Sequence, residues 1–488
     1  MNDRSNAKPM LIGGEWIAEG EEAIVSVNPA NGQVNYEICA ATPRHVDAAV
    51  ESARQAVSAP AWRDMLAHKR ARLLAKLADI IETRAEEFAR TQMLENGKVL
   101  AECRTQASAA AATFRYYAAV CETQGSEVTP PRGAYVSMTV YEPYGVVAAI
   151  TPWNSPLTME AQKVAPALAA GNAIILKPSE LTPSAGLALG QAALDAGVPP
   201  GIVNVLPGTG KVAGETLVRH GGVKFVSFTG GTASGRHIAG IAAQKLMPIA
   251  LELGGKSPHV VFADANLDAA AAAVADGIFE ATGQSCVAGS RLFVERSAYN
   301  KVVGIISERA KHLKLDLPDA PGAQLGPISS FAHRERVEQY VSTACAEGGK
   351  VVAGGARPQD SRLAGGAYYL PTVVTGLSNA ATVCQQEIFG PVLCVLPFDG
   401  EDDLVAQAND SVYGLAAGIW TRDYQRAWRV ARRLDAGTVW INTYKQLSIA
   451  TPFGGFKDSG FGREKGIGGL RLYQQVKSLY WGLDTPLA

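Results

Sequence analysis

The sequence predicts an α/β fold with two parallel sheets and a small additional β element. Between residues 145 and 262, wholly apolar runs alternate with segments of helical periodicity, and a second alternation continues to about residue 440. Strand patterns at 134–141 and near the C-terminus fit neither alternation. Apolar strands that alternate with helices are typical of a parallel sheet covered on both faces.

Length and composition narrow the class of protein. The chain has 488 residues, enough for two or three domains, and its hydrophobic and charged fractions are 47% and 19%. The net charge of -1 gives no basic surface, so no nucleic-acid and no membrane partner is expected. No apolar run reaches the length of a membrane helix, and the first ten residues are polar, without the apolar region of a signal peptide.

The cysteines indicate the compartment. There are seven, an odd number, and none forms a Cys-x-x-Cys pair. Free thiols suit a reducing cytoplasm better than a disulfide framework, so a cytoplasmic location is expected. The seven histidines are scattered, so no metal site is expected.

The N-terminal third is predicted to be short strands followed by a helical layer. Residues 8–39 read as strands with turns at Gly13-Gly14 and Asn31-Gly32. Apolar residues at three- and four-residue spacing predict helices over 44–59, 67–90 and 95–121. A polar, proline-rich stretch at 124–132 then leads into the strand pattern at 134–141, and we expect this excursion to form an arm that leaves the domain.

The middle of the chain predicts the first parallel sheet. Its strands are expected at 146–150, 173–176, 202–205, 224–228 and 248–251. Its helices are expected at 160–170, 182–197, 211–219 and 233–243, the second with Thr182 as N-cap and Pro183 at the first position. Such sheets bind ligands outside the carboxyl ends of their strands, so those ends are where a site is expected.

The second alternation predicts another α/β unit. A helical run at 269–281 precedes it, and the tail at 470–481 resumes a strand pattern. Strands are expected at 291–294, 351–352, 392–396, 418–420 and 438–441. Helices are expected at 302–312, 333–347, 402–409 and 424–433.

Two glycine-rich turns suggest nucleotide binding. Gly208 opens a G-x-G-x-x-x-G stretch that has one residue more than the usual dinucleotide fingerprint, and 228–232 ends a strand and opens a helix with small residues. Small residues there let a pyrophosphate approach backbone N–H groups. Lys177 and Glu180 end another strand and could hydrogen-bond ribose hydroxyls; the carboxylate would repel a 2′-phosphate, which favours NAD over NADP.

Cys286 is the candidate nucleophile, in the stretch 282–291 of small and polar residues. A thiol reacts only as thiolate and needs a base and an oxyanion donor. Glu252 and Asn154 are the candidates for these two functions, and both lie at predicted strand ends. The alternative is that Cys286 is only a packed structural cysteine.

The motifs, in order, resemble the aldehyde dehydrogenase superfamily over nearly the whole chain. They are Trp153-Asn154, the 177–180 KPSE stretch, the 251–256 LELGGK stretch, the 283–286 GQSC stretch, the 387–391 EIFGP stretch and the 452–457 PFGGFK stretch. The resemblance implies that Cys286 attacks the aldehyde, that Asn154 and the Cys286 N–H hold the oxyanion, and that Glu252 activates the water that hydrolyses the thioester. Lys163 and Glu464 match positions proposed to relay protons.

The resemblance also implies the cofactor and the domains. The residues expected to bind NAD are Ile150, Thr151, Pro152, Trp153, Lys177, Ser179, Glu180, Gly208, Val212, Phe228, Thr229, Gly230, Gly231, Leu253, Glu387 and Phe389. Residues 1–123 and 144–254 would form a Rossmann-like NAD-binding domain, and 255–454 a catalytic domain. Residues 124–143 and 470–488 would form a bridging element that makes a homodimer or homotetramer.

The expected pocket for the small-molecule aldehyde departs from the family pattern. It would comprise Ser155, Met159, Gln162, Ser285, Val287 and Tyr444. Ser155 and Gln162 stand where many members have large aromatic residues, so we expect a wider and more polar pocket, with Lys445 on the loop that caps it. Two alternatives stay open: a dehydrogenase that transfers the acyl group to CoA, which the intact Glu252 motif disfavours, and a non-catalytic protein that retains the fold.

Overall fold

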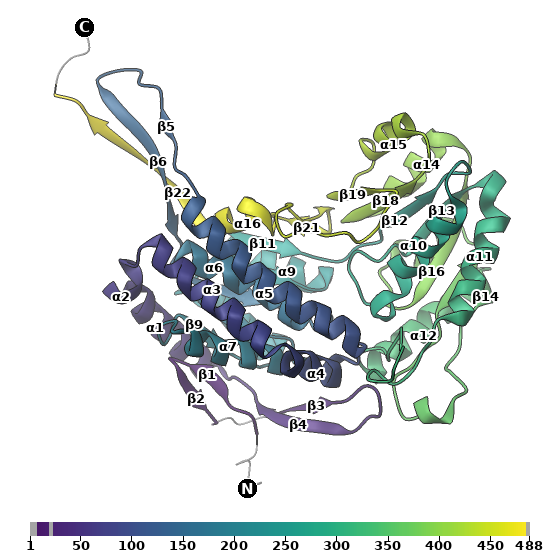
Figure 1. The fold of residues 1–488 in the computed structure, drawn as a ribbon, viewed down its shortest axis with the longest axis horizontal. Coiled ribbons are helices and arrows are strands. Elements are labelled where there is room, and N and C mark those ends of the chain that lie inside the picture. The colour runs from purple at the N-terminus through teal and green to yellow at the C-terminus, as the bar shows by residue number, and fades with distance from the viewer. Residues whose placement is uncertain (1–6, 19–22, 485–488) are drawn as a thin grey trace.

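The structure is a computed structural model that describes residues 7–18 and 23–484 (Figure 1). Residues 1–6 and 19–22 of the predicted NAD-binding domain, and 485–488 of the predicted bridging element, lie outside the described residues. Two largely parallel sheets form the body, and a three-stranded antiparallel sheet extends from it as an arm (Figure 1). The α/β fold class predicted from the sequence is confirmed.

The first sheet has the strand order β2-β1-β9-β8-β7-β10-β11-β21. Its central strands are β9 (Val203–Val205), β8 (Ala173–Lys177), β7 (Val146–Ile150), β10 (Phe225–Thr229) and β11 (Ile249–Glu252), and they are parallel. Antiparallel partners join both edges: β1 (Met10–Ile12), which pairs with β2 (Glu15–Ile17), and β21 (Gly460–Phe461). Every residue of β7 and β8 is buried, which is why these runs contain no polar residue before the final Lys177.

Helices cover this sheet. The structure gives α1 (Pro43–Ser58), α2 (Pro60–Arg63), α3 (Ala67–Thr83), α4 (Ala85–Asn96), α5 (Leu100–Thr123), α6 (Pro156–Ala170), α7 (Ser184–Ala196), α8 (Glu215–Arg219) and α9 (Thr232–Gln244). Helices α1 and α6 pack on the central strands, and α3 and α5 pack on α6. The predicted helical layer of the N-terminal third is therefore an outer layer of the first sheet.

The second sheet has the order β14-β15-β16-β13-β12-β18-β19 and is parallel except for β14. Its strands are β12 (Pro258–Val261), β13 (Arg291–Glu295), β14 (Lys350–Ala353), β15 (Thr372–Thr375), β16 (Val392–Phe398), β18 (Ala416–Trp420) and β19 (Thr438–Ile441). The helices of this part are α10 (Leu267–Phe279), α11 (Tyr299–His312), α12 (Phe331–Ala346), α13 (Thr382–Gln385), α14 (Gly400–Asn409) and α15 (Tyr424–Ala431). Neither β12 nor β15 was predicted from the sequence.

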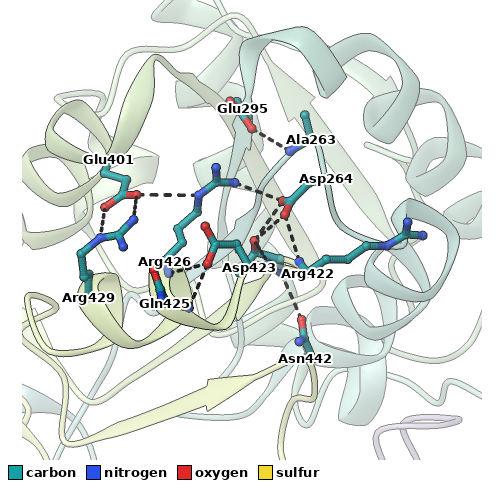
Figure 2. A network of polar contacts seen from close by, with 11 residues as sticks. Ala263, Asp264, Glu295, Glu401, Arg422, Asp423, Gln425, Arg426, Arg429 and Asn442 are labelled. Carbon is teal, nitrogen blue, oxygen red and sulfur yellow. Dashed lines mark hydrogen bonds and ion pairs between the residues drawn. The ribbon is translucent and has the colours of Figure 1, made fainter.

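A polar network closes the carboxyl edge of the second sheet (Figure 2). Asp264, after β12, accepts hydrogen bonds from the Thr421 hydroxyl and the Arg422 N–H and pairs with Arg426 at 3.2 Å. Asn442 accepts a bond from the Thr421 N–H. The network connects β12, β18, β19 and α15. Structural contacts thus occupy the carboxyl edge of the second sheet, and its amino edge is left for a functional site.

The helix boundaries around residue 90 were predicted wrongly. Instead of helices at 67–90 and 95–121, the chain breaks at Arg84 and again at Gly97, where φ is +75° and the last turn of α4 ends. A Cβ at Gly97 would lie 2.5 Å from Pro327 Cγ, so the turn requires glycine. Apolar spacing continues across both breaks, and periodicity alone could not reveal them.

Two other boundaries differ. Helix α7 begins at Ser184 with Pro183 as its N-cap, and Thr182 does not cap it; the Glu95 carboxylate accepts the Ser184 N–H instead. In the tail, 466–471 form α16 (Gly466–Arg471), and the strand starts only at Gln474.

The arm consists of β5 (Val128–Thr129), β6 (Tyr135–Pro143) and β22 (Gln474–Gly482) in the order β22-β6-β5. It extends well beyond the helical body (Figure 1). Smaller hairpins are formed by β3 (Ala23–Val27) with β4 (Val34–Cys39) and by β17 (Tyr413–Gly414) with β20 (Phe456–Lys457). Within the described residues, no helix is long and apolar enough to cross a membrane.

Candidate active site

The candidate site lies where the two sheets meet. Glu252 is the last residue of β11, at the carboxyl edge of the first sheet. Cys286 lies five residues before β13 begins, at the amino edge of the second sheet. The segment 253–257 connects β11 directly to β12, so a short link fixes one edge against the other.

The loop that carries Cys286 begins with a left-handed turn. Ala281, Thr282 and Gly283 have φ values of +56°, +55° and +71°, a conformation that side chains other than glycine rarely adopt. The turn is fixed from outside: the Glu102 carboxylate accepts the Ala281 N–H at 2.9 Å, and the Thr282 hydroxyl donates to the Gly326 carbonyl at 3.0 Å. It reverses the chain after α10 and presents Cys286 toward the first sheet.

Asn154 lies beside this loop. Its Nδ2 donates to the carbonyl of Gln284 at 3.0 Å. Burial, with smaller contributions from the Glu387 and Glu252 carboxylates, raises the pKa of the Cys286 thiol to about 12. At neutral pH the resting side chain is therefore a neutral thiol, and its activation requires a base.

Glu252 is buried, and its Oε2 has no hydrogen-bond partner among the residues that the structure describes. Burial raises its pKa well above the usual range, and the neighbouring Glu464 raises it further, whereas Lys163 opposes the shift. A carboxyl group whose pKa is raised toward neutrality can exchange protons at working pH. Glu464 is in turn held by Lys163, whose Nζ lies 2.5 Å from its Oε1 and 2.8 Å from the Ser227 hydroxyl. The sequence-predicted group Glu252, Lys163 and Glu464 is thus brought together.

The strand ends of the first sheet carry the predicted cofactor residues. Lys177 ends β8 and pairs with Glu180 at 3.3 Å; Ser179 lies between them. Gly230 and Gly231 join β10 to α9, and a Cβ at Gly231 would meet no atom within 4 Å, so open space lies in front of this turn. The remaining residues of the group lie at or just beyond strand ends or in the turn after β9: Ile150, Thr151, Pro152, Gly208, Val212, Phe228, Thr229 and Leu253.

Unpaired hydroxyls mark the same edge. The side-chain oxygens of Thr151 and Thr229 are buried without a hydrogen-bond partner in the described part of the chain. Buried polar groups are normally paired, so this edge suits a ligand rich in polar atoms. Together with the open turn at Gly231, these hydroxyls fit a dinucleotide.

Glu387 and Phe389 approach from the second sheet, before β16. A Glu387 oxygen accepts the Gly255 N–H at 3.1 Å, and a Cβ at Gly254 would lie 2.3 Å from the other oxygen. Gly254 therefore has to be glycine for this carboxylate to sit at the strand end. The Phe389 ring packs edge-on against Trp153 at 5.2 Å. His333, which the sequence analysis missed, donates a hydrogen bond from Nε2 to the Phe389 carbonyl at 2.7 Å.

The predicted pocket residues lie in three places. Ser155 is the N-cap of α6, and Met159 and Gln162 follow on the same side of that helix. Ser285 and Val287 flank the nucleophile. Tyr444 is buried behind them: its hydroxyl donates to the Val287 carbonyl at 2.9 Å, and its ring stacks on His259 at 4.1 Å.

Two polar residues that the sequence analysis missed contact Ser155. The Ser155 hydroxyl receives hydrogen bonds from Gln106 at 3.2 Å and from Lys98 at 3.4 Å. Gln106 lies on α5, some 50 residues earlier, and no local pattern distinguishes it from a solvated glutamine. Among the described residues, no group of three or more His, Cys, Asp or Glu side chains could hold a metal ion.

A thiol, an amide donor and a shielded carboxyl group, facing a sheet edge suited to a dinucleotide, are typical of a dehydrogenase that works through a cysteine. The comparisons agree. The aldehyde dehydrogenase family pattern matches residues 16–479, and the chain belongs to this family. A betaine aldehyde dehydrogenase of Bacillus subtilis is 38% identical over 476 residues, which cover 97% of each chain.

Solved structures are equally similar. A putative aldehyde dehydrogenase from Burkholderia cenocepacia has a TM-score of 0.96 at 40% identity and covers 98% of both chains. An aldehyde dehydrogenase from Bacillus cereus, solved as its NAD+ complex, has a TM-score of 0.95 at 39% identity, covering 99% of this chain and 98% of the other.

Proposed function

We propose that the protein oxidises an aldehyde to a carboxylic acid through Cys286, with NAD as the cofactor and water as the acyl acceptor. The observation that carries the proposal is the approach of Glu252, at the end of β11, to Cys286, whose loop is held by Asn154. Family membership makes the chain an NAD-dependent aldehyde dehydrogenase. The roles of individual residues are our assignment.

Cys286 acts first. Its thiol proton leaves to a base, and Sγ adds to the aldehyde carbonyl to give a thiohemiacetal. The Asn154 amide has two N–H groups, of which one is held by the Gln284 carbonyl; the second and the Cys286 backbone N–H donate to the oxyanion. NAD, when bound, accepts the hydride that leaves the carbonyl carbon.

Glu252 acts second. It takes a proton from water, and the resulting hydroxide attacks the thioester. The bond between the acyl carbon and Cys286 Sγ then breaks, which returns Cys286 to the thiol. Glu464 and Lys163 pass the proton onward, which their 2.5 Å contact supports. The balance is one aldehyde, one water and one NAD+ giving the acid, NADH and a proton.

The choice between NAD and NADP depends on residues at the carboxyl end of β8. Glu180 is exposed and, among residues 7–18 and 23–484, pairs only with Lys177, so its charge is available to repel a 2′-phosphate. We assign Lys177, Ser179 and Glu180 to the adenosine end of the cofactor, and Glu387 and Phe389, beside Trp153, to the nicotinamide end.

We also propose the assembly and the location. Residues 1–123 and 144–254 form the NAD-binding domain, 255–454 the catalytic domain, and 124–143 with 470–488 a bridging element that makes a homodimer or homotetramer. The exposed apolar side chains of β22, among them Val476, Tyr480 and Trp481, support the last assignment. A cytoplasmic location is supported by unpaired thiols such as Cys103 and Cys384.

NADH formation at 340 nm with a panel of aldehydes, with and without CoA, tests the function. We expect turnover that needs NAD and no CoA, and its loss in Cys286→Ala with NAD binding retained. Turnover that depends on CoA, or wild-type turnover in Cys286→Ala, would contradict the proposal.

A further inference from the structure

Lys465 has a backbone conformation that is rare for a residue with a side chain. Its φ is +61° and its ψ is 172°, in a region that is adopted almost only by glycine. The residue lies between Glu464 and α16, and it is only 7% exposed. A strained backbone of this kind persists only where the surrounding structure holds it in place, and such residues cluster at functional sites.

The ammonium group of Lys465 has no anionic partner. It makes no hydrogen bond and no ion pair with any residue in 7–18 or 23–484, and its nearest recorded contact is the Phe453 ring, 5.3 Å from Nζ to the centroid. Glu464, the nearest carboxylate in sequence, is engaged by Lys163. Glu252 also acts electrostatically on Lys465, but no ion pair joins the two side chains within the described residues.

This unpaired cation lies beside the nucleophile. Phe453 packs in the same small apolar cluster as Cys286, together with Val287, Leu415 and Trp440. Cys286, Glu252 and Glu464 are the titratable groups whose charges act on Lys465, and burial lowers its own pKa. The Nζ of Lys256 is fully shielded from solvent, whereas the Nζ of Lys465 retains some solvent-accessible area.

Two other lysines near the site have direct polar partners. Lys445 pairs with Glu280 at 3.3 Å, and Lys98 faces Glu102 and donates to Ser155. Of these three lysines, Lys465 is therefore the one whose ammonium makes no hydrogen bond and no ion pair within the described residues. A buried, unpaired charge is costly unless a ligand supplies the opposite charge.

We propose that Lys465 recognises a carboxylate on the substrate, so that the enzyme acts on aldehyde acids in preference to plain alkanals. The proposal rests on the proposed function, because the aldehyde end of the same molecule must react with Cys286. The ammonium and the substrate carboxylate form a charge-assisted pair. The polar wall made by Ser155, Gln106 and Lys98 agrees with a substrate that is not purely apolar.

The test compares two substrates of equal chain length, glutaric semialdehyde and pentanal, in wild type, Lys465→Met, Lys465→Arg and Lys445→Met. Wild type should prefer the acid by roughly tenfold or more in kcat/KM. Lys465→Met should raise KM for the acid about 30-fold, with kcat for both substrates and KM for pentanal within about threefold. Lys465→Arg should keep most of the preference, and Lys445→Met, the matched loss of a paired lysine, should keep all of it.

Two results would overturn the proposal. One is a wild-type enzyme without preference for the acid. The other is a fall in kcat for both substrates in Lys465→Met, which would mean that the lysine acts on the thiol. Turnover of pentanal by the wild type would show that the proposed function holds even if the proposal for Lys465 fails. If Lys465→Met does not fold, calorimetry of glutarate with wild type and Lys465→Arg decides: binding is expected in both, and its absence in wild type refutes the proposal.

Discussion

At the scale of single residues, Cys286 is a protonated and therefore weakly reactive thiol in the resting protein. Its pKa is raised to about 12 by burial and by the Glu387 and Glu252 carboxylates, so the thiolate fraction at neutral pH is small. Because a raised pKa leaves the thiol neutral below it, reactivity must rise with pH across the whole accessible range. Enzyme without cofactor should be alkylated by iodoacetamide about tenfold faster for each pH unit up to about pH 9. Mass spectrometry of the Cys286 peptide gives the rate, and a plateau between pH 6 and 8 would contradict the raised pKa.

In the proposed mechanism, Glu252 acts in the second half of the reaction. Glu252→Gln keeps the size of the side chain but removes the base, so we expect deacylation to slow about 10²–10⁴-fold. Stopped-flow should show a burst of NADH close to one equivalent per site and slow turnover thereafter. Loss of the burst itself would show that Glu252 is needed to activate the thiol as well.

Much of the site could be predicted from sequence because its members occur in local motifs. Cys286, Glu252, Asn154 and Glu387 each stand beside a strand end or a glycine turn that the printed sequence reveals. Gln106 and His333 could not be found this way, because they contact residues 49 and 56 positions away in the chain and nothing in their own neighbourhood signals the contact. Lys465 stands next to the predicted Glu464, but only the structure shows its left-handed backbone and its contact with the Phe453 ring.

At the scale of elements, the link between β11 and β12 determines how the two sheets meet. A Cβ at Gly254 would lie 2.3 Å from a Glu387 oxygen, so Gly254→Ala must displace that carboxylate from the Gly255 N–H. We expect KM for NAD to rise about tenfold, since a lost charged hydrogen bond costs about 1.5–3 kcal/mol. Isothermal titration of NAD and a thermal melt separate weak binding from unfolding.

Gly240→Ala is the matched control, because a Cβ there meets no atom within 4 Å and the residue lies within α9. It should leave KM for NAD unchanged and raise the stability by about 1 kcal/mol, since alanine is favoured over glycine in a helix. An unchanged KM in Gly254→Ala would show that Glu387 does not hold the cofactor.

The elements themselves were predictable where burial imposes one pattern. Strands β7, β8 and β10 are largely apolar and were found within one or two residues, because both faces of the sheet are covered. The breaks at Arg84 and Gly97 were missed, since a helix can end while its apolar stripe continues into the next one. The start of α7 is set by the distant Glu95 carboxylate, which no local rule anticipates.

At the scale of the whole molecule, the arm is the feature that a single chain does not explain. On β22, Val476, Tyr480 and Trp481 are 64%, 69% and 73% exposed. Exposed apolar groups on an extended ribbon favour burial against another copy. We expect the double variant Val476→Asp, Tyr480→Asp to shift the protein toward monomer in light scattering coupled to size exclusion. The variant Val34→Asp changes an equally exposed valine outside the arm and should leave the mass unchanged; a monomeric wild type would contradict the assignment.

The return of the C-terminal segment to the first sheet has a consequence for biosynthesis. Lys163 is separated from Glu464 by 301 positions, and β21 closes the edge beside β11 only after the second sheet has been made. A ribosome-bound chain that already displays Cys286 thus lacks the carboxylate that neutralises Lys163. At about 5–20 residues per second, that interval lasts on the order of ten seconds or more. A nascent polypeptide that has not yet reached Glu464 therefore lacks one member of the proposed proton relay, although Cys286 has already been made.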